Sequence, residues 1–203
     1  TAGLCMDPTV RTTLAFVEIN ENGERNFSFA RKPGADTQLR KEELDRELLS
    51  DCRIFHFGSL SLTDEPSRSA TWEAARLAKA AGALISYDPN YRPPLWRSQE
   101  EAAEGMKSVV SLVDVMKVSD EESLLLTGET TYEKAALRLL AQGPKLCKRL
   151  FRLRRGGRKH HIIPALGQRL GDAKADSPAR AGDQRQLLLA HCPSSFYVFS
   201  HGL

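Results

Sequence analysis

Short apolar runs and amphipathic segments alternate along most of the chain. Near its beginning, β-rich runs at residues 11–19 and 26–31 flank Asn22-Gly23. This dipeptide tolerates positive φ and favours the tight turn of a β-hairpin. The pattern therefore predicts a two-stranded hairpin over about residues 11–31.

Beyond the hairpin, strand-like and helix-like patterns follow one another. Apolar runs predict strands at residues 53–60, 83–89 and 114–120. Helical spacing predicts helices at residues 41–49, 66–82, 102–113 and 132–143. Asp64 is placed to cap the second helix and Gly82 to end it. This order predicts an α/β fold, with a mostly parallel sheet flanked by helices.

Polar residues gather where three predicted strands end, in the segments FGSLSLTDEP, DPNYRPPLW and KVSDEE. In a parallel sheet these ends share one edge, where loops can bind ligands without disturbing the core. Carboxylates, an amide and a guanidinium along one edge suit a polyhydroxylated or phosphorylated ligand.

Residues 12–128 resemble the middle of a fructokinase of the ribokinase-like (PfkB) carbohydrate kinase family. Four collinear segments carry the resemblance: TTLAFVEINENGERNFSFARKPGAD, IFHFGSLSLTDEPSRSAT, GALISYDPNYRPPLW and KVSDEESLLLTG. The resemblance implies an incomplete ribokinase-like fold in which the hairpin is a lid over the sugar. It also implies ATP and Mg²⁺ as cofactors, fructose or a similar hexose as substrate, and a homodimer through the lid.

The resemblance also implies roles for individual residues. Arg31 would reach the substrate, and Asn90 and Arg92 would shape the sugar and phosphate region. Glu122 would serve magnesium, acting through water, with Ser119 where many family members have Asn. Ala30 stands where relatives usually have an aromatic residue.

Each of these residues also has a structural interpretation. Arg31 could be an edge-strand charge, Asn90 and Arg92 could only shape a loop, and Glu122 could be an acid favoured at a helix N-terminus. His56, within an apolar strand, is expected to be a hydrogen-bonded structural histidine rather than a base.

Two departures from the family pattern concern catalysis. The chain starts just before the lid, so we expect a truncated domain without the family's N-terminal sugar contacts. In the family, a GAGD motif at a helix N-terminus holds the phosphates, and its Asp takes the proton of the sugar hydroxyl. No intact GAGD is present in this sequence; the remnant DSPARAGD ends at Asp183, which could be a displaced relic of that base. We therefore expect little turnover from this chain, and a noncatalytic sugar- or nucleotide-binding or regulatory remnant is the rival interpretation.

The charge pattern divides the chain near Lys145. Residues 1–144 carry 17 Lys and Arg against 23 Asp and Glu, whereas residues 145–203 carry 12 against 3 and lack sustained periodicity. We assign residues 1–144 to a partial kinase domain, with an α/β core at about 41–144, and residues 145–203 to a basic tail that is disordered or frame-shifted.

The tail admits three explanations. It could be a nucleic-acid-binding arm, a metal site built from Cys147, His160 and His161, or the product of a reading-frame shift near Lys145. The abrupt change in composition favours the frame shift, so we do not expect nucleic acid as a partner.

Apolar stretches of the roughly 18–20 residues that span a membrane are missing from the sequence, as is a basic-then-apolar leader. The four cysteines lack CxxC spacing, which favours free thiols. We expect a cytoplasmic protein without a membrane partner.

Overall fold

The computed structural model describes residues 3–23, 25–149, 164–165 and 197–199. An antiparallel hairpin of β1 (Leu14–Ile19) and β2 (Arg25–Ala30) comes first, with Leu14 opposite Ala30 and Ile19 opposite Arg25. Gly23 adopts a φ of 76°, as the turn requires. The predicted hairpin is confirmed.

The main sheet has the strand order β7-β6-β5-β4-β3-β8. Its four central strands are parallel, and they are β3 (Ile54–Gly58), β4 (Leu84–Asp88), β5 (Val115–Val118) and β6 (Leu146–Arg149). Two short antiparallel strands, β7 (Pro164–Ala165) and β8 (Tyr197–Phe199), pair with β6 and β3. The predicted mostly parallel sheet is confirmed.

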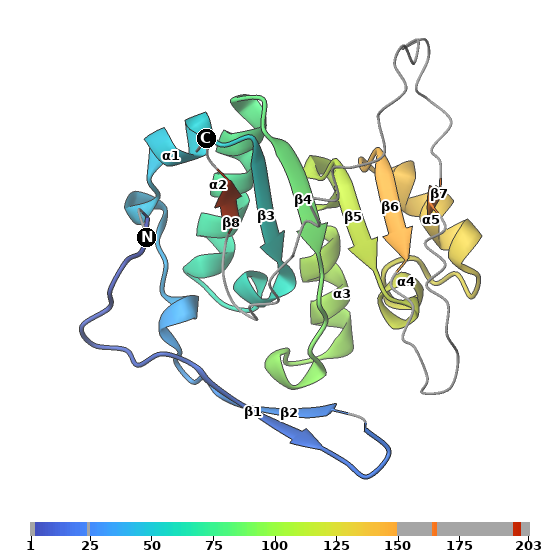
Figure 1. Cartoon of the computed structure of the whole chain (residues 1–203), viewed down its shortest axis with the longest axis horizontal. Helices are drawn as coiled ribbons and strands as arrows, with labels where there is room; N and C mark the ends of the chain where they lie inside the picture. Colours follow the sequence, from blue (N-terminus) through green and yellow to red (C-terminus); the bar gives the residue numbers. More distant parts are fainter. Residues whose placement is uncertain (1–2, 24, 150–163, 166–196, 200–203) are drawn as a thin grey trace, which may run out of the picture.

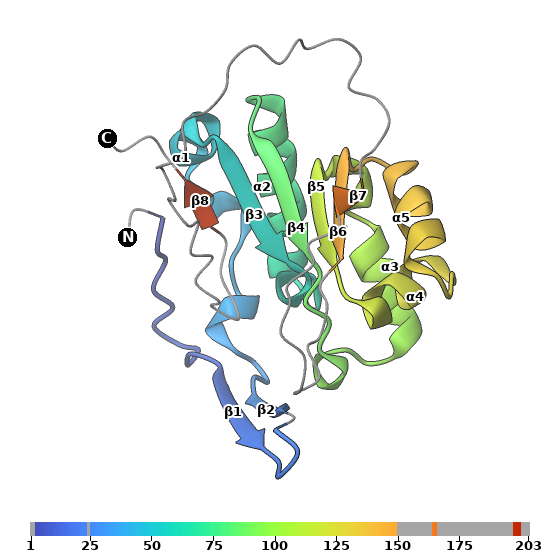
Figure 2. The ribbon, with the colours of Figure 1, turned by 45° about the vertical axis from the view of Figure 1, so that its right-hand side comes forward.

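Helices connect the strands and lie on one side of the sheet (Figures 1 and 2). The larger ones are α2 (Ser67–Ala80), α3 (Gln99–Lys107), α4 (Asp120–Thr127) and α5 (Tyr132–Leu140). The smaller ones are α1 (Arg46–Asp51) and the 3-10 turns η1 (Ala35–Thr37), η2 (Lys41–Glu43), η3 (Ser59–Leu62), η4 (Pro93–Leu95) and η5 (Val110–Leu112).

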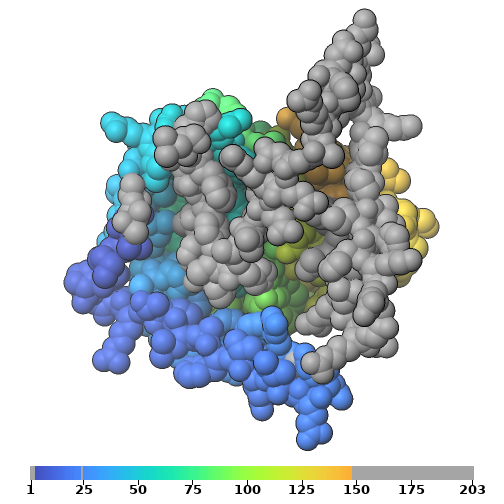
Figure 3. All heavy atoms as spheres, in the orientation of Figure 1, coloured from blue at the N-terminus to red at the C-terminus, as the bar shows by residue number. Residues whose placement is uncertain are grey.

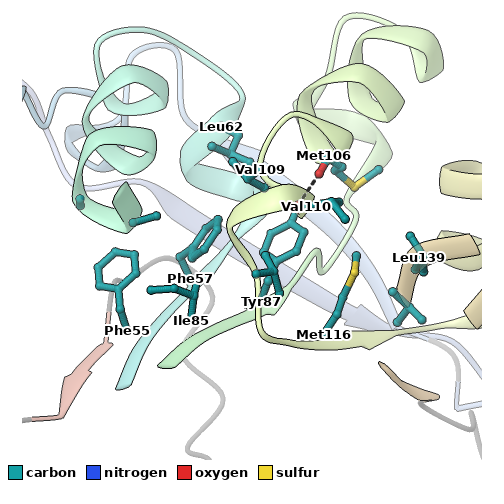
Figure 4. Close-up of a cluster of buried hydrophobic side chains, with 14 of the residues drawn as sticks. Phe55, Phe57, Leu62, Ile85, Tyr87, Met106, Val109, Val110, Met116 and Leu139 are labelled. Carbon is teal, nitrogen blue, oxygen red and sulfur yellow. Dashed lines mark hydrogen bonds between the residues drawn. The ribbon is translucent and has the colours of Figure 1, made fainter. Parts of the chain in front are cut away.

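The hydrophobic core fills the space between the sheet and these helices. Phe57 stacks on Tyr87 with ring centroids 4.8 Å apart, and Figure 4 shows both rings among buried side chains from α3, η5 and β5. The alternate residues of β3 and β4 on the opposite sheet face, such as His56 and Ser86, are only half-buried. Because successive strand side chains point to opposite faces, one face builds the core while the other carries polar groups.

Three helix predictions need correction. The segment 41–49 divides into η2 and α1, because Asp45 caps a new helix by accepting from the Leu48 N–H at 2.9 Å. The predicted helix at 102–113 ends at Lys107, and η5 follows. Asp64 does not cap α2 with its side chain, whereas Gly82, with a φ of 93°, does follow the end of that helix.

The sheet continues past the charge boundary at Lys145. Strand β6 starts at Leu146, where Val115 pairs with it, so part of the segment assigned to the tail belongs to the sheet. The division into two domains otherwise stays a prediction. Across the described part of the chain, every helix is too short or too polar to span a membrane.

Candidate functional site

Strands β3 to β6 all point toward the edge of the sheet along which the hairpin lies (Figure 1). We call this edge the rim, formed by η3 after β3, residues 89–95 after β4, and Ser119 with the start of α4 after β5. In Figure 3 the hairpin borders this edge of the body. The three polar strand ends therefore lie together, as the sequence predicts.

Backbone contacts join the first two rim segments. The Ser59 N–H donates to the Pro89 carbonyl at 3.0 Å, and a Cβ at Gly58 would lie 3.1 Å from the Asp88 carbonyl. Among the described residues, the buried Ser59 hydroxyl has no hydrogen-bond partner. A side chain at position 58 would crowd the Asp88 carbonyl, so glycine favours the close approach of the two strand ends.

Asp88 forms an ion pair with Lys117, and both side chains are largely shielded from solvent. The register of β3, β4 and β5 places them on the same sheet face as His56 and Ser86. Burial lowers the pKa of His56, and the positive charge of Lys117 acts in the same direction against the opposite pull of Asp88. His56 Nδ1 lies 3.0 Å from Ser86 Oγ, in agreement with the structural role expected for this histidine.

Asn90 turns the chain at the rim. Its φ of 48° makes it the one non-glycine residue with positive φ in the described part of the chain. Asparagine tolerates this left-handed conformation better than most residues, which explains why Asn suits the position. The turn sends residues 91–95 toward the hairpin, and strand β2 contacts η4.

Arg92 links the rim to the hairpin. Its guanidinium carbon lies 4.7 Å from the centroid of the Phe27 ring on β2, within the range of a cation–π interaction. Its Nη1 donates to the Tyr91 carbonyl at 3.0 Å. Phe27 in turn stacks on Phe29 at 6.2 Å with nearly parallel rings.

Glu122 is buried and held by two rim segments. One carboxylate oxygen accepts from the Tyr91 N–H at 2.8 Å, and the other accepts from the Ser119 N–H at 2.7 Å. The Glu122 N–H donates to the Ser119 hydroxyl, which completes a capping box at the start of α4. Both oxygens therefore already have backbone donors.

These contacts bear on the predicted magnesium role of Glu122. The residue is 6% exposed, and a metal ion bonded directly to its carboxylate would compete with the two N–H donors. Within the described residues, no three His, Cys, Asp or Glu side chains form a group that could hold a metal. Direct coordination does not fit this arrangement, and a role through water stays a prediction.

The pKa of Tyr87, in the core next to the rim, is shifted by burial and by nearby negative charge. Burial raises the pKa of its hydroxyl well above the usual value, and the carboxylates of Glu122 and Asp88 act in the same direction. Tyr87 is therefore a neutral core residue whose hydroxyl reaches the Met106 carbonyl (Figure 4).

Arg31 lies where the hairpin joins the body. Its guanidinium donates to Asp36 at 2.8 Å, to the Thr63 hydroxyl at 2.8 Å and to the Leu60 carbonyl at 2.6 Å. Its side chain is only 5% exposed. The structure thus shows Arg31 fastening the base of the hairpin to η3, and its predicted contact with substrate stays a prediction.

Two predicted sites involve residues outside the described part of the chain. Asp183, proposed as the relic of the catalytic base, lies there, and so do His160 and His161 of the hypothetical metal site. Cys147 is described and fully buried, and burial raises the pKa of its thiol to about 11. A metal prefers the thiolate, so this environment disfavours Cys147 as a ligand.

The sequence analysis did not single out Phe27 or Lys117. A signal for Lys117 is present in the sequence. The lysine alternates with Val115 along one strand, so both face the same side of the sheet, and the neighbouring strand ends at Asp88. Phe27 carries no such signal, because a phenylalanine on a hairpin strand is common and its partner Arg92 is 65 residues away in sequence.

Known proteins resemble this chain in sequence and in fold. Fructokinase-2 of Zea mays is 50% identical over 145 residues, which cover 71% of this chain and 43% of that protein. Fructokinase from Xylella fastidiosa with bound ATP superimposes with a TM-score of 0.64 at 39% identity, covering 72% of this chain and 47% of that one. Fructokinase from Vibrio cholerae, a double mutant with fructose, ADP and potassium bound, gives 0.66 at 33% identity, covering 73% and 47%.

This chain spans about half the length of the curated relatives it matches, with 45%, 48% and 54% of three Arabidopsis thaliana proteins covered. The structural neighbours show that the fold is ribokinase-like, as the sequence predicts. The family profile described as pfkB family carbohydrate kinase matches residues 1–151, which include the hairpin, the rim and strands β3 to β6. On these grounds the chain belongs to the pfkB family of carbohydrate kinases.

Proposed function

We propose that this chain is part of an ATP-dependent sugar kinase that transfers the γ-phosphoryl group of ATP to a hydroxyl of fructose or a similar hexose. The observation that carries the proposal is the meeting of the hairpin with the rim, where Arg92 faces Phe27. A hairpin held there can cover a ligand at the strand ends and exclude water from it.

The rim offers suitable groups for the two substrates. The amide of Asn90 can donate to and accept from sugar hydroxyls. The guanidinium of Arg92 supplies several donors for the charge that spreads over phosphoryl oxygens during transfer. Magnesium bound with ATP would neutralise phosphate charge. Relatives crystallised with ATP or with fructose and ADP support these substrate classes.

The proposal also covers the oligomeric state of the protein and its location in the cell. Leu14 and Phe16 lie on the hairpin face opposite Phe27 and are 56% and 60% exposed. An exposed apolar face on a two-stranded hairpin favours cover by a second copy of the chain. We propose a homodimer through this face, in the cytoplasm.

A chimera tests the kinase proposal. Residues 12–144 of this chain would replace the corresponding segment of a full-length fructokinase, and phosphorylation of fructose with MgATP would be followed by a coupled assay. We expect turnover within the range of about 1–100 per second typical of kinases. A chimera that melts like the parent enzyme and binds fructose without turnover would support the noncatalytic alternative instead.

A further inference from the structure

Arg92 is held from two sides by groups far apart in sequence. On one side, the Phe27 ring of β2 faces its guanidinium at 4.7 Å. On the other, the Glu122 carboxylate accepts from the N–H of Tyr91, the residue before Arg92. These contacts form a continuous path from the N-terminus of α4 to the hairpin.

The Glu122 contact fixes the backbone that carries Arg92. Because Glu122 is buried, with 6% of the residue exposed, water competes poorly for the bond between its carboxylate and the Tyr91 N–H. Its second oxygen accepts from the Ser119 N–H, which ties the same side chain to the cap of α4. Glu122 thus sets where the segment after Asn90 lies relative to α4.

The Phe27 contact fixes the other end of the Arg92 side chain. An arginine side chain has several rotatable bonds, so a fixed backbone alone does not place its guanidinium. Phe27 is itself stacked against Phe29, and the base of β2 is fastened through Arg31 to η3. The ring is therefore part of an anchored surface and can restrict the guanidinium.

We propose that Phe27 and Glu122 are positioning residues for Arg92, Phe27 through its side chain and Glu122 through the backbone before it, and that hairpin placement and the cap of α4 are coupled through this residue. The proposal rests on the proposed function, in which Arg92 binds the phosphoryl or sugar group. It gives Glu122 a role that requires no metal contact. Movement of the hairpin away from the rim would then also release Arg92 from its working position.

Hydrogen exchange with mass spectrometry tests this in the chain itself, without any need for turnover. The segments to follow are residues 25–30 of β2 and residues 90–96 of the rim, with β4 as an internal reference for an intact sheet. Phe27→Leu keeps an apolar side chain but removes the ring face. We expect exchange in residues 90–96 to become about two- to fivefold faster, the effect of losing one exposed cation–π contact.

Phe16→Leu is the matched control, since Phe16 lies on the opposite face of the same hairpin. It is expected to leave exchange in residues 90–96 unchanged. Phe27→Tyr keeps the ring and is expected to behave like the wild type. The proposal is overturned if Phe27→Leu has no effect at 90–96, if Phe16→Leu has the same effect, or if Phe27→Tyr accelerates exchange as much as leucine does.

Glu122→Gln tests the contact between Glu122 and the Tyr91 N–H. The control is Glu121→Gln, at the exposed neighbouring position. The glutamine weakens a charge-assisted bond, so exchange at residues 90–96 should rise about tenfold, and exchange in β2 should rise with it. With Glu122→Gln present, Phe27→Leu should add less than about twofold to the exchange rate at residues 90–96, because both contacts hold Arg92 in place. If the two substitutions had fully additive effects on exchange, or if Glu122→Gln left exchange in β2 unchanged, the coupling would be contradicted.

The outcome is separable from that of the kinase proposal. An inactive chimera would argue against the assigned reaction and leave the exchange results standing. Uncoupled exchange would argue against the positioning roles of Phe27 and Glu122, even in a chimera that phosphorylates fructose.

Discussion

Arg31 and Arg92 carry the same functional group in different surroundings. Arg31 donates to Asp36, Thr63 and Leu60 and is nearly inaccessible to solvent. Arg92 is half-buried, with its guanidinium on an aromatic ring at the rim. The first environment indicates a structural contribution, whereas the second places the cation at the rim, where the proposed ligand would bind. Substitutions should therefore separate stability from activity.

Arg92→Ala in the fructokinase chimera should lower kcat by about 100- to 1,000-fold, the cost of losing one oriented donor to developing charge. Arg92→Lys should restore only part of this, since lysine lacks the planar fork. Steady-state kinetics and thermal melting would be measured together, with the exposed Arg97→Ala as control. A loss of less than about threefold, accompanied by a large drop in Tm, would show that Arg92 is structural.

Arg31→Met, in contrast to Arg92→Ala, should mainly lower stability. The change leaves Asp36 without its buried cation, and breaking a buried ion pair costs about 3 kcal/mol or more of unfolding free energy. Urea titration of the whole chain would measure this loss. Lys32→Met, at the exposed next position, should have little effect. Equal stability of the two variants would contradict the fastening role of Arg31.

Asp114 joins three strands at the end of the sheet opposite the rim. Its carboxylate accepts from the Ile85 N–H at 3.0 Å and lies 3.0 Å from Lys145 Nζ, and its backbone carbonyl accepts from the Lys145 and Leu146 N–H groups. Burial alone would raise the pKa of this carboxyl, but the Ile85 hydrogen bond and the charges of Lys145 and Lys79 outweigh it, so the pKa lies below 3.8. The start of β6 is thus placed by a residue that precedes β5.

This pKa predicts a pH dependence. Because the folded state lowers the pKa, Asp114 contributes its full stabilisation above the unfolded value of 3.8 and loses it as pH falls through the lower folded value. Asp114→Asn should cost about 1.5–3 kcal/mol of unfolding free energy at pH 7. Urea titrations from pH 7 to pH 3 should show the two proteins converging. If the difference in unfolding free energy between the two proteins stayed constant across that range, the stabilising role of the ionised Asp114 carboxylate would be ruled out.

At the scale of the described fold, the body holds the hairpin at its base and near Phe27 but covers little of its two strands. Its two strands pair with each other, and apart from the Arg92–Phe27 region its side chains are mostly exposed. Two-stranded hairpins are marginal in water without cover. A partner surface on the hairpin would explain why apolar residues are placed on both of its faces.

Sedimentation velocity tests the dimer. The wild-type chain should sediment as a dimer at micromolar concentration, and Leu14→Ser with Phe16→Ser should convert it to a monomer by removing apolar area from the outer face. Leu137→Ser, at a 68% exposed leucine on α5, is the control and should remain dimeric. A monomeric wild type would contradict the proposed interface.

The sequence by itself determined the hairpin, the order of the central elements and the rim. Asn22-Gly23, the apolar runs and the polar strand ends are local signals, and each depends on residues close together in the chain. Short helices were less predictable, because local capping at Asp45 and the turn after Lys107 interrupt periodic patterns.

The tertiary structure alone decided which rim residues meet. Glu122 reaches the Tyr91 N–H across 31 positions, Lys117 reaches Asp88 across 29, and Arg92 reaches Phe27 of the hairpin. These pairs depend on strand register and on the left-handed turn at Asn90, which bring distant segments to one edge. A charged or aromatic residue has the same local pattern whether it binds a ligand or supports its neighbour, so only spatial contacts separate these two roles.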